Sequence, residues 1–301
     1  MTDVVWLASY PKSGNTWLRM LIAALSPVGE RGIDINAMPA DQTIASARDI
    51  FDDRLLIGSD LLTHDEIDCL RPRLYEDLAG DSAATGPSQA NLGVRFVKAH
   101  DAYTLTPLGE PLFAGARAAQ GAIVIVRDPR DVVPSLANHN LSTIDAAVEF
   151  LNSTQSAFSD GTAGLPPQLR QKLLDWSGHV ASWLDQTDMP VHVLRYEDLM
   201  RDTAGCLMSA MRFAHRPIEQ HRAERAVALA SFEKLQAQEA EMGFAEWNAR
   251  QAKQTRFFRR GKMGSWREEL TREQVRKVER AHGAMMSRMG YELSTDVAVA
   301  E

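Results

Sequence analysis

A continuous apolar run, Val4–Ser9, leads directly into a short turn and then into a helical pattern over residues 15–25. A run without polar alternation is typical of a strand that is covered on both faces, as in a parallel sheet. A strand, a tight turn and a helix in this order predict an α/β fold. In such a fold the first turn lies at the carboxyl end of its strand, where ligands bind.

Three more short apolar runs follow along the chain, at Arg95–Ala99, residues 122–127 and Val191–Arg195. Right-handed crossovers between parallel strands then give a single doubly wound α/β domain with a central parallel sheet. Further helices are predicted over residues 131–139, 168–184, 197–212 and 271–289. The last of these begins with a capping box, in which Thr271 is followed three residues later by Gln274.

The turn after the first strand carries residue types that bind an anion. A helix N-terminus offers free backbone N–H groups and the positive end of the helix dipole. Lys12 adds a charge, Gly14 permits close backbone approach, and Ser13, Asn15 and Thr16 add hydrogen-bonding groups. These features predict a phosphate cradle, although an ordinary helix start would share some of them. The turn is not a Walker A loop, because the glycine-rich lead-in is absent.

Composition excludes several classes of protein. The 301-residue chain has a net charge of −7, which argues against a large nucleic-acid footprint. No apolar run reaches the length of about 18 residues that a membrane span needs, and no signal peptide is evident. Cys69 and Cys206 form neither a disulfide framework nor a zinc site, and no histidines show metal-ligand spacing. We therefore expect a cytoplasmic protein without a metal.

Residues 9–17, Ser-Tyr-Pro-Lys-Ser-Gly-Asn-Thr-Trp, resemble the 5′-phosphosulfate-binding loop of the sulfotransferase family that uses 3′-phosphoadenosine-5′-phosphosulfate (PAPS). The family has a threonine where this chain has Asn15. The resemblance implies that the loop binds the donor and that the aromatic residue at its end stacks on the adenine. The residues concerned are Pro11, Lys12, Ser13, Gly14, Asn15, Thr16 and Trp17.

Two later segments, in the family's order, resemble those that hold the 3′-phosphate. Arg127 and Ser135 match an arginine and a serine that grip this phosphate, and a guanidinium suits it by bidentate hydrogen bonding. A late segment is similar to the family's Arg-Lys-Gly-x-x-Gly-x-Trp. It implies that three residues close over the 3′-phosphate, with Ser265 replacing a usual aspartate nearby. These three residues are Arg259, Arg260, which replaces a usual lysine, and Gly261.

The resemblance also implies an adenine site and a general base. Tyr196, Ser231 and Phe232 match adenine-site positions, although Phe232 could equally be a core residue. His100 matches the family's general base, and Lys98 lies two residues earlier on the same face of the strand. Histidine suits this role because its ordinary pKa lies near neutrality.

The residue after the histidine departs from the family, which often has leucine and proline there. Asp101 occupies the position, and two alternatives are open for it: a hydrogen bond to the histidine or exposure to solvent. The family's late dimer motif is also altered, since Arg267, Thr271, Arg272 and Arg276 stand in its place. A homodimer is possible, but its interface cannot be assumed.

The implied function is transfer of a sulfuryl group from PAPS to a hydroxyl or amine of a small-molecule, natural-product or sugar acceptor. His100, Lys12 and Lys98 are the expected catalytic residues. The domain covers residues 1–293, with acceptor-pocket insertions at about 27–93, 141–167 and 236–255 and a flexible tail at 294–301. A P-loop-type kinase or ATPase and a non-catalytic nucleotide-binding protein are the alternatives.

Overall fold

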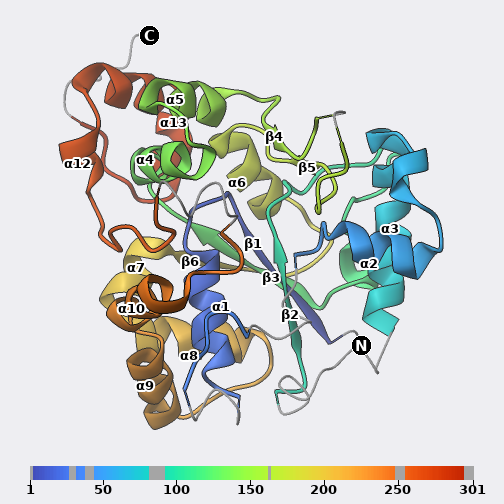
Figure 1. The fold of residues 1–301 in the computed structure, drawn as a ribbon, viewed down its shortest axis with the longest axis horizontal. Coiled ribbons are helices and arrows are strands. Elements are labelled where there is room, and N and C mark those ends of the chain that lie inside the picture. The colour runs from blue at the N-terminus through green and yellow to red at the C-terminus, as the bar shows by residue number, and fades with distance from the viewer. Residues whose placement is uncertain are drawn as a thin grey trace.

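A four-stranded parallel sheet forms the centre of the molecule, which we describe from a computed structural model (Figure 1). The structure describes residues 3–26, 32–37, 44–80, 92–161, 164–247 and 255–294. The strand order is β2-β1-β3-β6, and β1 pairs with β2 through Val4 and Arg95 and with β3 through Val5 and Gly121. This confirms the predicted α/β class with a central parallel sheet. The strands are β1 (Val4–Ser9), β2 (Arg95–Ala99), β3 (Gly121–Val126) and β6 (Val191–Arg195).

Helices cover both faces of the sheet because alternate residues of its strands are buried in different cores. Trp6 of β1 belongs to a core shared with α2 (Arg48–Leu55), α3 (His64–Gly80), α4 (Pro129–Asn140), α5 (Ile144–Asn152), α6 (Trp176–Leu184) and α13 (Arg272–Arg288). Leu7 belongs to the opposite core, with α1 (Asn15–Ala23), α8 (Thr203–Phe213), α9 (Gln220–Leu229) and α10 (Phe232–Met242). Both groups of helices can be followed in Figure 1. The continuous apolar character of the strands is thus explained.

Local capping fixes where several helices begin. The Asp128 side chain accepts a hydrogen bond from the Arg130 backbone N–H, with Pro129 at the first helical position of α4. At the start of α13, Thr271 and Gln274 form the predicted capping box. The described residues also form three short elements, η3 (Ser59–Leu61), η5 (Gly115–Arg117) and α12 (Trp266–Glu269).

Two predicted helices were wrong in their bounds. The helix expected over residues 168–184 begins only at Trp176, where Asp175 caps it, and Gln171–Lys172 instead forms β5, antiparallel to β4 (Ala157–Phe158). Leu169 and Leu173 are buried in the same core as Trp176 although they precede the helix. Their spacing from Trp176 therefore matches a helical period without a helix. The helix expected over residues 197–212 is divided into α7 (Tyr196–Arg201) and α8, because Asp202 caps a new helix by accepting from Gly205 N–H.

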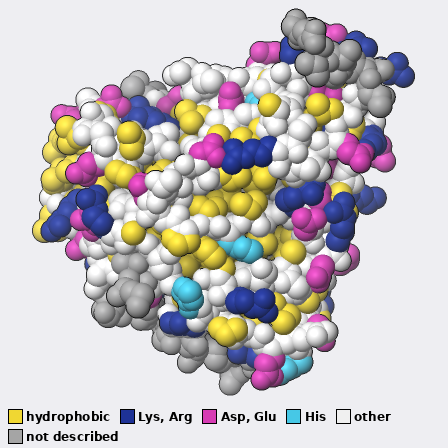
Figure 2. Space-filling view, turned by 180° about the vertical axis from the view of Figure 1, so that it is seen from behind, with side chains coloured by type: hydrophobic (Ala, Val, Ile, Leu, Met, Phe, Trp, Pro, Cys, Tyr) yellow, Lys and Arg dark blue, Asp and Glu magenta, His cyan; other side chains and the backbone are white. Residues whose placement is uncertain are grey.

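Figure 2 shows the face of the molecule that is turned away from the viewer in Figure 1. This face carries a band of hydrophobic side chains across its middle, with Lys and Arg interspersed among Asp and Glu. No helix in the described ranges is long and apolar enough to span a bilayer. The predicted insertion at 27–93 is largely helical where it is described, since it contains α2 and α3. Residues 295–301 of the predicted tail lie outside the described residues.

Candidate active site

A cavity of about 1100 Å³ opens at the carboxyl ends of the strands. The structure brings together there most residues that the sequence predicted for the site, from four strand ends and a late loop. They are Pro11, Lys12, Gly14, Asn15, Thr16, Trp17, Lys98, His100, Arg127, Ser135, Tyr196, Phe232, Arg259, Arg260 and Gly261. Two predicted residues do not line it: Ser13 is fully buried, and the Ser231 hydroxyl caps α10 by accepting from Lys234 N–H.

The first turn is held in an unusual backbone conformation. Gly14 has φ +105°, and a Cβ there would lie 2.6 Å from Cδ2 of Tyr196. A glycine is therefore required because the Tyr196 ring packs directly on the turn. The amide nitrogen of Asn15 is engaged within the fold, since Nδ2 donates to the Leu7 carbonyl at 2.7 Å and to Ser9 Oγ at 3.2 Å. Its role is to fasten the start of α1 to β1.

Lys12 lies among aromatic rings and other cations. Its Nζ is 3.9 Å from the ring centroid of Phe257 and 5.1 Å from that of Trp247. Burial, followed by the charges of Lys98 and Arg127, lowers the pKa of Lys12 to about 7. An anion in the cavity would offset both effects and favour the protonated amine.

Arg127 connects the first turn to the late loop. Its Nη1 donates to the Lys12 carbonyl at 3.1 Å and its Nη2 to the Lys262 carbonyl at 3.3 Å, while the guanidinium lies 4.4 Å from the Tyr196 ring centroid. Within the described ranges, Nε of Arg127 and the buried Ser13 Oγ have no hydrogen-bond partner. Arg127 also lines the cavity, where its guanidinium is placed to bind an anion.

The late loop is tied to α4 by one carboxylate that the sequence did not single out. Asp131 accepts from Gly264 N–H at 2.6 Å, from Ser265 Oγ at 3.2 Å and from Trp266 N–H at 2.9 Å. The serine that replaces the family's aspartate thus stabilises the turn. Gly261 has φ +58°, and a Cβ there would lie 2.6 Å from the Phe232 ring. Phe232 therefore supports this loop and lines the cavity as well as contacting the core.

The two late arginines are partnered by acidic side chains. Arg259 binds both carboxylate oxygens of Glu269, and Arg260 binds Glu268 at 3.0 Å. Trp17 also has a defined position, with its indole N–H donating to the Ala230 carbonyl at 3.0 Å. These contacts fix the arginines and the aromatic residue in the wall of the cavity.

His100 is positioned by the strand beside it. Its Nδ1 lies 2.9 Å from the Ser9 carbonyl oxygen, which can only accept a hydrogen bond. Nδ1 therefore carries the proton, and the lone pair is on Nε2. Burial, followed by the charge of Lys98, holds the pKa of His100 well below its usual 6.5. The imidazole is neutral at pH 7 and can take a proton.

Glu246 is a charged residue of the site to which the sequence assigned no role. It accepts from Arg19 at 2.8 Å and from Lys98 Nζ at 3.3 Å. Burial opposes its ionisation, but Lys98 and Arg19 outweigh this and hold the pKa of Glu246 below its usual value. Because 148 residues separate Glu246 from Lys98, no local sequence pattern could have indicated the pair.

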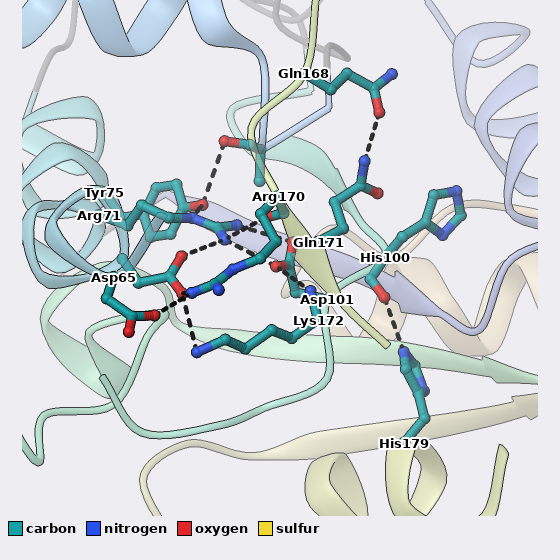
Figure 3. Close-up of polar contacts among 12 residues, drawn as sticks. Asp65, Arg71, Tyr75, His100, Asp101, Gln168, Arg170, Gln171, Lys172 and His179 are labelled. Carbon is teal, nitrogen blue, oxygen red and sulfur yellow. Dashed lines mark hydrogen bonds and ion pairs between the residues drawn. The ribbon is translucent and has the colours of Figure 1, made fainter. Parts of the chain in front are cut away.

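Neither alternative for Asp101 was right. Its carboxylate is buried and accepts two hydrogen bonds from Arg71, each at 2.8 Å (Figure 3). Asp101 Oδ1 also accepts from Lys172 N–H at 3.3 Å, and Arg71 donates to the Arg170 carbonyl at 3.1 Å. The pair therefore joins β5 to the end of β2, directly beside His100.

The remaining part of the cavity, which we call the acceptor half, has aromatic walls and a few polar groups. His139 stacks on Phe158 with ring centroids 5.5 Å apart, and Phe150 stacks on Phe158 at 5.6 Å. Burial, followed by the charge of Lys12, lowers the pKa of His139 to about 4. Gln168 and Gln171 also line this half. Among the described residues, no group of three or more His, Cys, Asp or Glu side chains could hold a metal ion.

Comparisons with known proteins point in one direction. The sequence model of the sulfotransferase domain matches residues 2–290. A flavonol 3-sulfotransferase of Flaveria bidentis is 26% identical over 288 residues, which cover 92% of this chain and 79% of that protein. A luciferin sulfotransferase of Photinus pyralis is 24% identical over 237 residues, 78% of this chain and 56% of that protein.

Solved structures show the same fold. A retinol dehydratase in complex with androsterone and the inactive cofactor PAP has a TM-score of 0.56 at 20% identity, covering 99% of this chain and 83% of that one. A mouse sulfotransferase complexed with PAP also has a TM-score of 0.56 at 20% identity, covering 96% and 86%.

Proposed function

The chain belongs to the sulfotransferase family, and from this premise we propose that it transfers the sulfuryl group of PAPS to a small-molecule hydroxyl or amine by in-line displacement, with His100 as general base. One observation carries the proposal. A neutral histidine, whose Nδ1–H donates to the Ser9 carbonyl, lines the same cavity as Lys12 and Arg127. A base and an anion site thus share one cavity.

The donor site would use the two groups of residues already described. Lys12 and Thr16 would hold the 5′ side, next to the bond that breaks, through a cation and the start of α1. Arg127 and Ser135 would hold the 3′-phosphate together with Arg259, Arg260 and Gly261. Trp17, Tyr196 and Phe232 would surround the adenine. PAP, the desulfated donor, is present in the related solved structures.

The protein's own groups have distinct tasks in the reaction. When bound, the donor supplies the sulfuryl group. His100 takes the acceptor proton on Nε2. Lys12 offsets the negative charge that grows on the leaving oxygen, and Lys98 helps to hold the sulfonate. Positioning and electrostatic stabilisation do most of the work in the related phosphoryl transfers, and the same holds here.

The kinase or ATPase alternative has lost its best candidate for a magnesium ligand. That residue, Asp128, accepts from the Arg130 side chain at 2.7 and 2.9 Å and caps α4. Both of its carboxylate oxygens are engaged, so the residue serves the start of the helix. Family membership argues against the non-catalytic alternative.

Replacement of the proposed base tests this function. We expect His100→Ala to lower kcat by about 10²–10⁴-fold and to leave PAP affinity, measured by calorimetry, close to that of the wild type. His221→Ala, on the exposed face of α9, is the matched control and should keep full activity. A folded His100→Ala protein with near-normal turnover would remove the histidine from the role.

The pH profile gives a second measurement. Because burial and Lys98 depress the pKa of His100 well below 6.5, the base stays neutral as the pH falls below 6.5. In the ligand-free enzyme, the His100 ring signals followed by NMR should therefore keep the shifts of the neutral ring from pH 7 through pH 6.5 and change only at clearly lower pH. A titration midpoint at or above pH 6.5 would contradict the assigned environment.

A further inference from the structure

Gln171 is a buried polar side chain of the acceptor half that lacks a full set of hydrogen bonds. It is 1% exposed and lines the cavity. Its Nε2 donates to Gln168 Oε1, whereas its own Oε1 has no partner among the described residues. A buried carbonyl oxygen without a donor is unfavourable. Because Gln171 lines the cavity, a donor for this oxygen would come from a ligand that enters there and displaces the atoms that now cover the oxygen.

The backbone around Gln171 is fixed to the same framework as the proposed base. On one side the Arg170 carbonyl accepts from Arg71, and on the other Lys172 N–H donates to Asp101. The Lys172 carbonyl also accepts from Ala102 N–H at 2.7 Å. Figure 3 shows the Gln171 side chain extending away from this network toward Gln168. Its position relative to His100 is therefore set by buried contacts, as a residue that selects a ligand requires.

The surroundings of Gln171 indicate the body of the ligand. Phe158, which pairs with Gln171 across the β4–β5 ladder, stacks on His139 and Phe150. Aromatic rings in offset or stacked arrangements bind a flat apolar body well. One unpaired oxygen beside such walls would select a single hydrogen-bond donor on that body.

We infer that Gln171 is a specificity-determining residue whose Oε1 accepts a hydrogen bond from a second hydroxyl or N–H of the acceptor, distinct from the group that is sulfated. The acceptors are then ring compounds that carry at least two hydrogen-bond donors. An analogue without the second donor leaves the buried oxygen unpaired, and this penalty is the source of the discrimination. The inference rests on the proposed function and deepens it.

Matched acceptors test the inference directly. The panel contains 2-naphthol, its dihydroxy counterparts with the second hydroxyl at position 3, 6 or 7, and the monomethyl ethers of these diols. With PAPS as donor, the wild type should prefer at least one diol over 2-naphthol by about 10–100-fold in kcat/KM. This exceeds the twofold advantage of two equivalent hydroxyls. The methyl ether of the preferred diol should lose the advantage, because an ether cannot donate.

Gln171→Met, which is similar in length but offers no carbonyl oxygen, should reduce the preference to within about twofold by slowing the diol. The same exchange at Gln220, exposed on α9, should leave the preference unchanged. PAP affinity of both variants, measured by calorimetry, should equal that of the wild type, which separates a lost contact from a damaged fold.

Three results would overturn the inference while leaving the proposed function intact. They are sulfation by the wild type without any preference for a diol, a methyl ether that is used as well as the diol, and a Gln171→Met enzyme that keeps the preference. Failure of the wild type to sulfate any member of the panel, with PAP binding intact, would likewise overturn the inferred class of acceptor. Failure to bind PAP at all would instead count against the proposed function, and the inference would fall with it.

Discussion

The affinity for the donor nucleotide should fall as the pH rises above 7, because Lys12 titrates there. Burial and the charges of Lys98 and Arg127 lower the pKa of Lys12 to about 7 in the free protein. A bound nucleotide brings phosphates next to this amine and moves its pKa back toward the ordinary 10.5. Well below pH 7 the amine is protonated in both states, so its titration no longer changes the affinity. Above pH 7 binding must take up a proton.

The size of the effect follows from this difference in pKa. Each pH unit between the free and bound pKa values weakens binding tenfold, or by about 1.4 kcal/mol. Because half of the amine is already neutral at pH 7, the dissociation constant of PAP should rise by about 50-fold from pH 7 to pH 9. The phosphates of PAP do not contribute over this range, because the second pKa of a phosphate monoester is about 6. Arginine does not titrate there either.

Calorimetry between pH 6 and pH 9, in buffers with different enthalpies of ionisation, measures both the affinity and the proton uptake. Lys12→Met should abolish both trends above pH 7. Lys98→Met removes a repelling charge and should move the decline to higher pH, whereas Glu246→Gln removes an attracting one and should move it to lower pH. A PAP affinity that stays flat from pH 7 to pH 9 without proton uptake would refute the reasoning.

Two further substitutions test the buried framework and the first turn. Arg71→Met leaves the carboxylate of Asp101 buried without its cation, so we expect a loss of about 3–5 kcal/mol in the free energy of unfolding by urea; Arg73→Met, exposed on the same helix, should change it by less than about 0.5 kcal/mol, and equal losses would contradict this. Gly14→Ala places a Cβ 2.6 Å from an aromatic ring and should weaken PAP binding by at least about tenfold. Gly109 also has a positive φ angle, +81°, but no neighbour within 4 Å of the Cβ position. Gly109→Ala should leave PAP binding unchanged; equal weakening in both variants would point to backbone strain alone.

The strands were predictable because each is buried on both faces and therefore reads as an unbroken apolar run. Three of the four predicted ranges coincide with β1, β2 and β6, and β3 is displaced by one residue. The helices were less predictable where a polar side chain caps a new start inside an apolar pattern. Asp175 and Asp202 do this at α6 and α8. A periodicity count cannot see such a start, because it weighs apolar spacing and not hydrogen bonds to the backbone.

That the motif residues would meet at one cavity was predictable, because each group comes from a contiguous turn. The charged contacts around them were not, because they join residues far apart in the chain. Glu246 meets Lys98, and Arg71 meets Asp101, only after the fold is formed. Gln171 could not be recognised either, since the sequence placed it in a helix and its significance is an unpaired oxygen in a buried position.

The position of the Arg71–Asp101 pair has a consequence for how this enzyme can change its acceptor. Arg71 belongs to α3, in the insertion between β1 and β2, whereas Asp101 follows the proposed base directly. The contacts of β5 with Asp101 attach the acceptor wall to that same point. The donor-binding turn has its own fastening, through Asn15 and the end of β1. A substitution that disturbs the contacts between Arg71, Asp101 and β5 should therefore shift His100 and alter kcat. A smaller change is expected in the affinity for the donor.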